Sequence, residues 1–432
     1  MVDISPRDNF VVTDVLIFDG SRFIERGYVV VGKGKICDVG EGTYEKAHDD
    51  IVPVYSMPDH TVLPGLIDAH IHGLGGNPIC LEQSLNFGVT TVCDMHNGRG
   101  SITKLQQFAS DPANKSRFAD FKSCGMGATI SGGWPEPVMR LHAKGPNVQT
   151  VIDRWPKLQS PHDADPFVQE QVEQCGAEYI KLFHELGDSL KNKMPSTPSL
   201  ELQRALIEAA HAHGLPAVGH AFSFEGMLEL LQCGIDGLMH APLDKARSDD
   251  YVGLFKEKKA FINPTLTCLA SQSSAADELQ RRFHADPFAQ KMLFNTKPRK
   301  NLAMGGESAH VQHGIDMTRK LYENGVPIVV GSDSSGQASG QQFGLTMHME
   351  MHLLAHEVDM KPIDVLKSST STTADRFGFT DRGSLDVGKK ADLILINGDV
   401  RDVMEDEQNL CLPIRAVWRD GVLDSRYDQF LE

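Results

Sequence analysis

The sequence has no long apolar run, no closely paired cysteines and no excess of basic residues. No apolar stretch approaches the ~20 residues that a membrane-spanning helix needs, and the start, MVDISPRDNF, has no basic segment followed by an apolar one. We therefore expect neither a membrane span nor a signal peptide. The eight cysteines are scattered without a C-x-x-C pair, which predicts reduced thiols and a cytoplasmic protein.

The charge balance of the chain is acidic. The 432 residues include 42 Lys and Arg against 58 Asp and Glu, which gives a formal net charge of -16. An acidic surface repels phosphate backbones and anionic lipids, so we expect no nucleic-acid partner and no membrane partner. Hydrophobic residues make up 41% and charged residues 23% of the chain, a balance typical of a globular protein with a large core.

The two ends of the chain are rich in β-type segments that glycine turns separate. Near the start these are residues 11–18 and 28–31, and near the end they are residues 391–398 and 414–423. Runs of Val, Ile and Leu between turn residues are typical of strands. We therefore predict one small domain that both ends build together.

The middle of the chain alternates eight strand-like segments with helical patterns. The clearest helix follows Thr197, its expected N-cap, and ends at Gly214. The alternation predicts an α/β fold, a (β/α)8 TIM barrel over residues 59–380, with a small β-sandwich domain formed by residues 1–58 and 381–432. The eight segments are residues 61–69, 89–95, 122–130, 178–183, 215–220, 235–240, 261–266 and 326–333.

Residues with metal-binding or ionisable side chains occupy the ends of five of these segments. The carboxyl ends of barrel strands meet at one face, where the catalytic groups of TIM barrels lie. Two of the histidines alternate along one extended segment and therefore point to the same side. The residues at these ends are His70, His72, Lys181, His220, His240 and Asp333.

These positions predict a metal centre. His220 and His240 end consecutive barrel strands, and Asp333 ends the eighth strand, which lies beside the first in a barrel. A single histidine at a strand end is more often structural, but four imidazoles and a carboxylate in barrel order favour a metal site. Zinc or a similar divalent ion prefers such ligands.

Lys181 has two interpretations. A buried lysine carries an expensive charge unless it is paired, so the first is a salt bridge. In the second, burial deprotonates the amine, which then captures carbon dioxide to form a carbamate that bridges two metal ions. Two divalent ions bring four positive charges, of which the carbamate, Asp333 and a bridging hydroxide would offset three. This charge balance favours the carbamate.

Seven motifs cover nearly the whole chain. They are LPGLIDAHIHG (63–73), FGVTTVCDM (87–95), YIKLF (179–183), PAVGHA (216–221), CGIDGLMHA (233–241), PIVVGSD (327–333) and DRGSLDVGKKADLILING (381–398). With these motifs the chain resembles the amidohydrolase superfamily, in the branch with a carboxylated lysine and a binuclear metal centre. Prolidase-like enzymes and a fungal ochratoxin-hydrolysing amidase are among the similar proteins. Imidazolonepropionases use one metal and lack the bridging lysine, so Lys181 argues against that activity.

The resemblance implies a division of the ligands between two metal ions, most simply zinc. His70, His72 and Asp333 would hold one ion. The histidines at the fifth and sixth strand ends would hold the other, and carboxylated Lys181 would bridge the two. Carbon dioxide or bicarbonate would supply the carbamate carbon. The similar proteins are commonly oligomeric, so we also expect a homo-oligomer.

The expected reaction is hydrolysis of an amide or peptide-like C–N bond in a small molecule, such as an N-acyl amino acid, a dipeptide or an ochratoxin-like amide. A metal-bridging hydroxide would attack the carbonyl carbon. Asp333 would accept the water proton and pass it to the leaving nitrogen. The alternatives are a lactone, ester or phosphotriester hydrolase at the same centre, and a catalytically silent scaffold.

Three positions near the predicted centre stand out. Phe222 occupies a position where many similar proteins carry a Tyr that polarises the substrate carbonyl. His184 stands where those proteins have small residues, and it could supply the missing hydrogen-bond donor or be structural. Trp134, in SGGWPEP (131–137), could stack on an aromatic substrate or cover the barrel. We therefore expect substrate contacts from Phe222, Trp134 and His184, and catalytic roles for His184 and Asp333.

Overall fold

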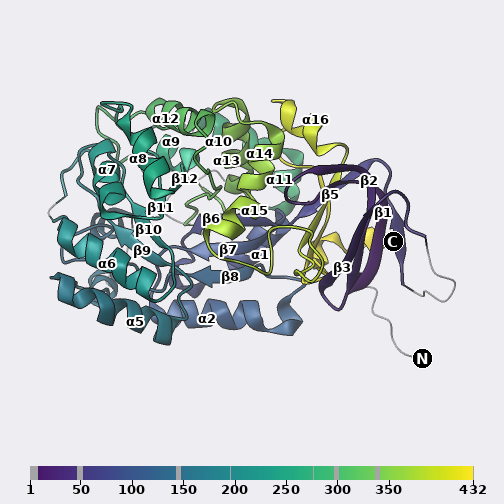
Figure 1. Cartoon of the computed structure of the whole chain (residues 1–432), viewed down its shortest axis with the longest axis horizontal. Coiled ribbons are helices and arrows are strands. Elements are labelled where there is room, and N and C mark those ends of the chain that lie inside the picture. Colours follow the sequence, from purple (N-terminus) through teal and green to yellow (C-terminus); the bar gives the residue numbers. More distant parts are fainter. Residues whose placement is uncertain are drawn as a thin grey trace.

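The computed structural model describes residues 8–45, 52–142, 147–194, 196–275, 277–295, 301–335 and 341–431. Within these ranges the chain is an α/β protein. A mixed β-sheet lies at one end of the molecule, and parallel strands surrounded by helices form the rest (Figure 1). No helix in these ranges is long and apolar enough to cross a membrane.

Strands from both ends of the chain belong to the mixed sheet. They are β1 (Asn9–Phe18), β2 (Phe23–Gly32), β3 (Lys35–Glu41), β4 (Val54–Ser56), β5 (His60–Pro64), β13 (Leu393–Asn397), β14 (Ile414–Arg419) and β15 (Val422–Leu423). Their order is β15-β14-β13-β5-β1-β2-β3, with β4 beside β1. β5 is the link between the two ends, because it pairs with β1 on one side and with β13 on the other.

The predicted β-sandwich would divide these strands between two packed sheets, whereas the described strands belong to one. The assignment of residues 1–58 and 381–432 to a separate domain stays a prediction. The segment 61–69 also differs from expectation, since its first half is β5 of the mixed sheet. The chain leaves this sheet at Gly65, where a Cβ would collide with the side chain of Thr90.

The parallel strands form two sheet pieces. The first holds β6 (Leu66–Ile71), β7 (Val89–Asp94) and β8 (Asp120–Ser123), and the second holds β9 (Ile180–Phe183), β10 (Ala217–His220), β11 (Gly237–Met239) and β12 (Phe261–Asn263). Single β-bridges connect them: Ala128 with Leu182 on one side, and Ile262 with Ile328 on the other. The predicted eighth strand, 326–333, contributes such bridges rather than a full strand, and Ser334 after it pairs with Ile71 of β6.

Sixteen helices within the described residues accompany these strands. They are α1 (Ile79–Asn86), α2 (Arg99–Ser110), α3 (Glu136–His142), α4 (Val148–Asp153), α5 (Ala164–Cys175), α6 (Leu200–Ala212), α7 (Phe224–Cys233), α8 (Asp250–Lys258), α9 (Leu266–Ser271), α10 (Asp277–Ala285), α11 (Pro287–Met292), α12 (Val311–Glu323), α13 (Leu345–His356), α14 (Pro362–Ser368), α15 (Ser371–Arg376) and α16 (Val400–Glu405). The N-cap of α6 is Ser199, not Thr197, because the Ser199 hydroxyl accepts the Leu202 N–H at 3.2 Å.

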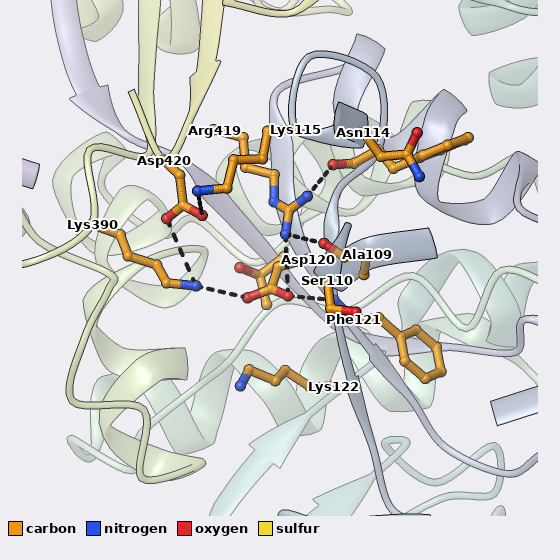
Figure 2. Close-up of polar contacts among 12 residues, drawn as sticks. Ala109, Ser110, Asn114, Lys115, Asp120, Phe121, Lys122, Lys390, Arg419 and Asp420 are labelled. Atoms are coloured by element: carbon orange, nitrogen blue, oxygen red, sulfur yellow. Dashed lines mark hydrogen bonds and ion pairs between the residues drawn. The ribbon is translucent and has the colours of Figure 1, made fainter. Parts of the chain in front are cut away.

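A partly buried charge cluster joins the first residue of β8 to the mixed sheet. Asp120 lies 2.7 Å from Arg382, 3.0 Å from Lys390 and 3.4 Å from Arg419 of β14. Figure 2 shows Asp120 between the Lys390 and Arg419 side chains. Arg419 also donates to the carbonyl of Ala109 at 2.7 Å, at the end of α2. These contacts fix the amino-terminal end of β8, so its carboxyl end is held at the opposite side, where the site lies.

Candidate metal centre and its cavity

A cavity of about 570 Å³ lies at the carboxyl ends of the parallel strands. All the metal ligands predicted from the sequence line it, together with two of the predicted substrate contacts. The predicted ligands in its lining are His70, His72, Lys181, His220, His240 and Asp333. The strand-end positions therefore converge as the sequence pattern predicts.

Asp333 connects the two histidines at the carboxyl end of β6, His70 in the strand and His72 directly after it. Its Oδ1 lies 3.1 Å from Nε2 of His70 and 3.1 Å from Nε2 of His72. The Asp333 backbone has a left-handed φ of 53°, which Asp adopts more readily than most residues. Burial raises the pKa of Asp333, but the hydrogen bond and charge of His72 outweigh burial and hold this pKa below its ordinary value. The carboxylate is ionised at neutral pH and can bind a cation.

His240 lies close to this group. Ligand atoms of His70, His240 and Asp333 lie within 4.8 Å of one another, as a shared metal ion requires. Burial holds the pKa of both His70 and His240 well below the ordinary value, so their rings are neutral and free to bind metal. The group takes members from both predicted ligand sets. The assignment of each ligand to one of two ions therefore stays a prediction.

His220 and His240 each have one ring nitrogen engaged by a protein oxygen. Nε2 of His220 lies 3.1 Å from Oε2 of Glu185, and Nδ1 of His240 lies 2.6 Å from the hydroxyl of Thr265. The two rings are neighbours, with centroids 4.7 Å apart. These contacts leave Nδ1 of His220 and Nε2 of His240 available for a metal. A hydrogen bond to the other ring nitrogen typically orients a metal-binding histidine and fixes its tautomer.

Lys181 is buried among these ligands. Its side chain is 1% exposed, and among the described residues its Nζ has no hydrogen-bond partner. Burial lowers the pKa of Lys181 to about 7, against the opposing charge of Asp333. A buried amine without a partner is costly, and at neutral pH a large fraction of it is uncharged. The described contacts therefore do not supply the salt bridge that was one of the two interpretations.

Trp134 and Phe222 form an aromatic surface against the histidines. The Trp134 ring stacks on His220, with centroids 4.7 Å apart and an interplanar angle of 18°. The Phe222 ring lies 4.5 Å from His220 and 4.5 Å from His240. Both aromatic residues line the cavity. Trp134 therefore covers a predicted metal ligand and also faces the space that a substrate would occupy.

His184 does not reach this cavity. Its Nε2 lies 2.7 Å from Glu229, and its Nδ1 lies 3.2 Å from the Gln203 amide. Side chains alternate along a strand, so Lys181 and Phe183 line the cavity while His184 points to the other side. The expected substrate contact and catalytic donor role of His184 therefore lack support in its placement, and both buried ring nitrogens already have partners.

Two residues beside the centre were missed in the sequence. Glu185 is buried, and its carboxylate accepts the N–H groups of Gly187 at 2.7 Å and Phe222 at 2.9 Å in addition to contacting His220. His96 lines the cavity, and its Nδ1 accepts the Gly127 N–H at 2.9 Å. His96 directly follows the second predicted strand, so the strand-end criterion could have found it. Glu185 gave no such signal.

Comparison with known proteins gives the family. The model of the amidohydrolase family matches residues 61–424. The N-acetylglucosamine-6-phosphate deacetylase of Bacillus subtilis is 22% identical over 418 residues, which cover 92% of this chain and 95% of that protein. The imidazolonepropionase of Deinococcus radiodurans is 22% identical over 435 residues, covering 92% and 91%.

Solved structures share the fold at similar identity. The structure of molinate hydrolase superposes with a TM-score of 0.75 at 18% identity and covers 98% of this chain and 96% of its own. Aspergillus niger ochratoxinase superposes with a TM-score of 0.70 at 16% identity, covering 96% and 95%. The family match spans most of the chain and includes every predicted metal ligand that lines the cavity. The chain therefore belongs to the amidohydrolase family, and it is a hydrolase that acts on carbon–nitrogen bonds.

Proposed function

We propose that the chain is a metal-dependent amidohydrolase that cleaves an amide bond of a small molecule at a binuclear centre. The observation that carries this proposal is the convergence of four histidines, one aspartate and one unpaired lysine on a single cavity. The two sheet pieces, joined by bridges at both sides, support a (β/α)8 barrel as the scaffold. A cytoplasmic homo-oligomer remains our prediction.

The donor set fits two divalent cations, for which we favour zinc. The imidazoles of His70 and His240 are neutral, Asp333 is ionised, and the amine of Lys181 has no hydrogen-bond partner among the described residues. His70, His72 and Asp333 would hold one ion and the histidines of β10 and β11 the other. Bound metal would supply Lewis acidity, which polarises a carbonyl and lowers the pKa of a water molecule.

We assign the bridging position to a carboxylated Lys181. The neutral amine attacks the carbon of carbon dioxide, an N–C bond forms, and one proton leaves to solvent. The product is an anion with two oxygens. It replaces a buried amine that has no hydrogen-bond partner among the described residues by a group that can bind cations. The lowered pKa of Lys181 supports this step, because only the uncharged amine is a nucleophile.

Asp333 is the residue that moves the proton. Its carboxylate faces the cavity between His70 and His72, so it can accept a proton from water and later give it to the leaving nitrogen. An amide needs that second transfer because an unprotonated amide anion is a poor leaving group. An activated ester does not.

One experiment measures metal and carbamate together. Full-length protein purified with zinc and ¹³C-bicarbonate should hold about two ions per chain and show one labelled carbamate carbon in its NMR spectrum. Lys181→Ala should remove that signal. The control is Lys122→Ala, since Lys122 pairs with Glu178 at 2.7 Å and lies outside the cavity lining. One ion per chain at full activity would contradict the binuclear centre, and no bound metal would indicate a scaffold.

A second experiment separates proton transfer from metal binding. Asp333→Asn keeps the shape and an oxygen donor but cannot take a proton. Hydrolysis of an anilide should fall by about 10²–10⁴-fold, whereas hydrolysis of a p-nitrophenyl ester should fall less, with zinc content measured on the same sample. Equal losses would contradict the role of Asp333 in leaving-group protonation. Activity on lactones or phosphotriesters without anilide cleavage would overturn the assignment to amides.

A further inference from the structure

The cavity walls around the metal centre are largely apolar. Trp134 and Phe222 lie against His220 and His240, as described above, and α3 continues this surface away from the centre. The residues that make up this apolar wall are Trp134, Val138, Met139, Phe222, Leu302 and Met304. If a substrate carbonyl lies beside His220, the group attached to that carbonyl would therefore contact aromatic rings and aliphatic side chains.

The charged groups of the described lining belong to the centre itself. Beyond Lys181, Asp333 and the histidines, the described polar lining consists of neutral groups such as Asn77, Gln83 and Gln272. A carboxylate or phosphate on a substrate would thus lose water on contact with this wall, and the described wall residues would offer no cation to pair with it.

Two cations of the described residues close to α3 are already paired with a carboxylate of that helix. Arg140 lies on α3 and Lys157 follows α4, and both contact the carboxylate of Glu136, at 3.3 Å and 3.1 Å. Neither belongs to the cavity lining. Glu136 also accepts the Gly132 N–H at 3.0 Å, so it holds the segment before α3 in place while it neutralises these two side chains.

From this arrangement, and resting on the proposed amide hydrolysis, we infer the substrate class. The substrate is an uncharged amide that carries an apolar group of about the size of an aromatic ring on its acyl side. Small polar amides and amides with an acidic acyl group are poor substrates. The apolar wall supplies the contact area, and the reacting carbonyl would lie beside the predicted metal ligands His220 and His240.

The test uses two anilides that differ by one charge. N-benzoyl p-nitroanilide and its 4-carboxybenzoyl analogue share the leaving group, so a difference in kcat/KM reports on the acyl side. We expect zinc-loaded, full-length protein to prefer the benzoyl compound by about tenfold or more. It should also prefer benzoyl to acetyl p-nitroanilide, since an apolar pocket discriminates by size.

A variant pair on α3 makes the test specific. Met139→Lys places a cation in the wall, so the preference for the neutral anilide should shrink by about tenfold or reverse. Leu141→Lys makes the same kind of change on the same helix, but Leu141 is 59% exposed and lies outside the cavity lining. That control should keep the wild-type preference.

The outcomes separate this inference from the proposed function. Hydrolysis with equal or greater activity on the carboxylated anilide would overturn the substrate class and leave amide hydrolysis intact. If no anilide is cleaved, calorimetry can still test the inferred substrate class by comparing the binding of benzanilide and 4-carboxybenzanilide to the zinc-loaded protein. Tighter binding of the neutral compound would support the preference for an uncharged acyl group, and equal or weaker binding would overturn it.

Discussion

Glu185 provides the sharpest prediction, because its carboxylate connects the chain after β9 to the predicted metal ligand on β10. One oxygen contacts Nε2 of His220 at 3.1 Å and accepts the Phe222 N–H at 2.9 Å. The other accepts the Gly187 N–H at 2.7 Å. The side chain is fully buried. We predict that Glu185 orients the His220 ring and keeps its proton on Nε2, so that Nδ1 faces the metal.

The size of the effect follows from these contacts. In Glu185→Gln the new side chain offers one carbonyl oxygen where the carboxylate offers two, so its NH2 group must face a donor. At least one hydrogen bond to a charged acceptor is lost, worth about 1.5–3 kcal/mol. Loss of the hydrogen-bond partner behind a metal-binding histidine typically lowers metal affinity by about 10–100-fold. We expect that loss for one of the two proposed zinc ions.

The assay is zinc competition with a chelator of known affinity, with thermal unfolding of the metal-free protein measured in parallel. Glu350→Gln is the matched control. Glu350 is a buried carboxylate that accepts the Leu266 and Thr267 N–H groups at 2.7 Å and 2.9 Å and does not line the cavity. Its variant can lose stability but should keep both zinc affinities. If Glu185→Gln binds both ions as tightly as wild type, the orienting role is wrong.

Two further predictions concern residues outside the cavity. His184→Asn should leave zinc content unchanged and kcat/KM within about threefold of wild type, because the His184 ring contacts Glu229 and Gln203 instead of the cavity; a loss of hundredfold or more at full metal content would restore its catalytic role. Burial would raise the pKa of Asp120, but the charges of Arg382 and neighbouring cations outweigh it and lower this pKa. Asp120→Asn should therefore lower the free energy of unfolding, measured in urea at pH 7, by about 3–5 kcal/mol. This difference from wild type should shrink as the pH falls below the ordinary Asp pKa of about 4. A difference that grows in acid would contradict the stabilising role of the charge cluster.

The strand ends were predictable from the sequence because their geometry is local. A strand alternates its side chains with a period of two, and parallel strands in register bring their carboxyl ends to one edge. The positions of His70, His220 and Asp333 follow from those two rules. The same period puts His184, three residues after Lys181 and directly after β9, on the opposite side, where its ring contacts Glu229 and Gln203.

Other features depend on contacts that no short sequence pattern encodes. Glu185 reaches His220 because the chain bends back after β9 through Gly187, which has a left-handed φ of 82°. β5 belongs to the mixed sheet, and the chain passes from it to β6 at Gly65, whose close approach to Thr90 leaves no room for a Cβ. Each case depends on a tertiary contact between residues distant in sequence or on a change in the direction of the chain. Hydrophobic periodicity carries no information about either.

If the proposed metal centre and substrate class are correct, Trp134 and Phe222 couple metal binding to substrate recognition at one place in this cavity. Both rings contact His220, and the Phe222 N–H donates to the Glu185 carboxylate, which we predict to orient the His220 ring. Truncating either aromatic side chain would remove apolar area for the substrate and also free the histidine to move. Activity lost in such a variant has two causes that kinetics alone cannot separate. Among the described contacts, Met139 on α3 has none with the predicted metal ligands. A substitution of Met139 therefore tests substrate recognition without a direct change at the proposed metal centre.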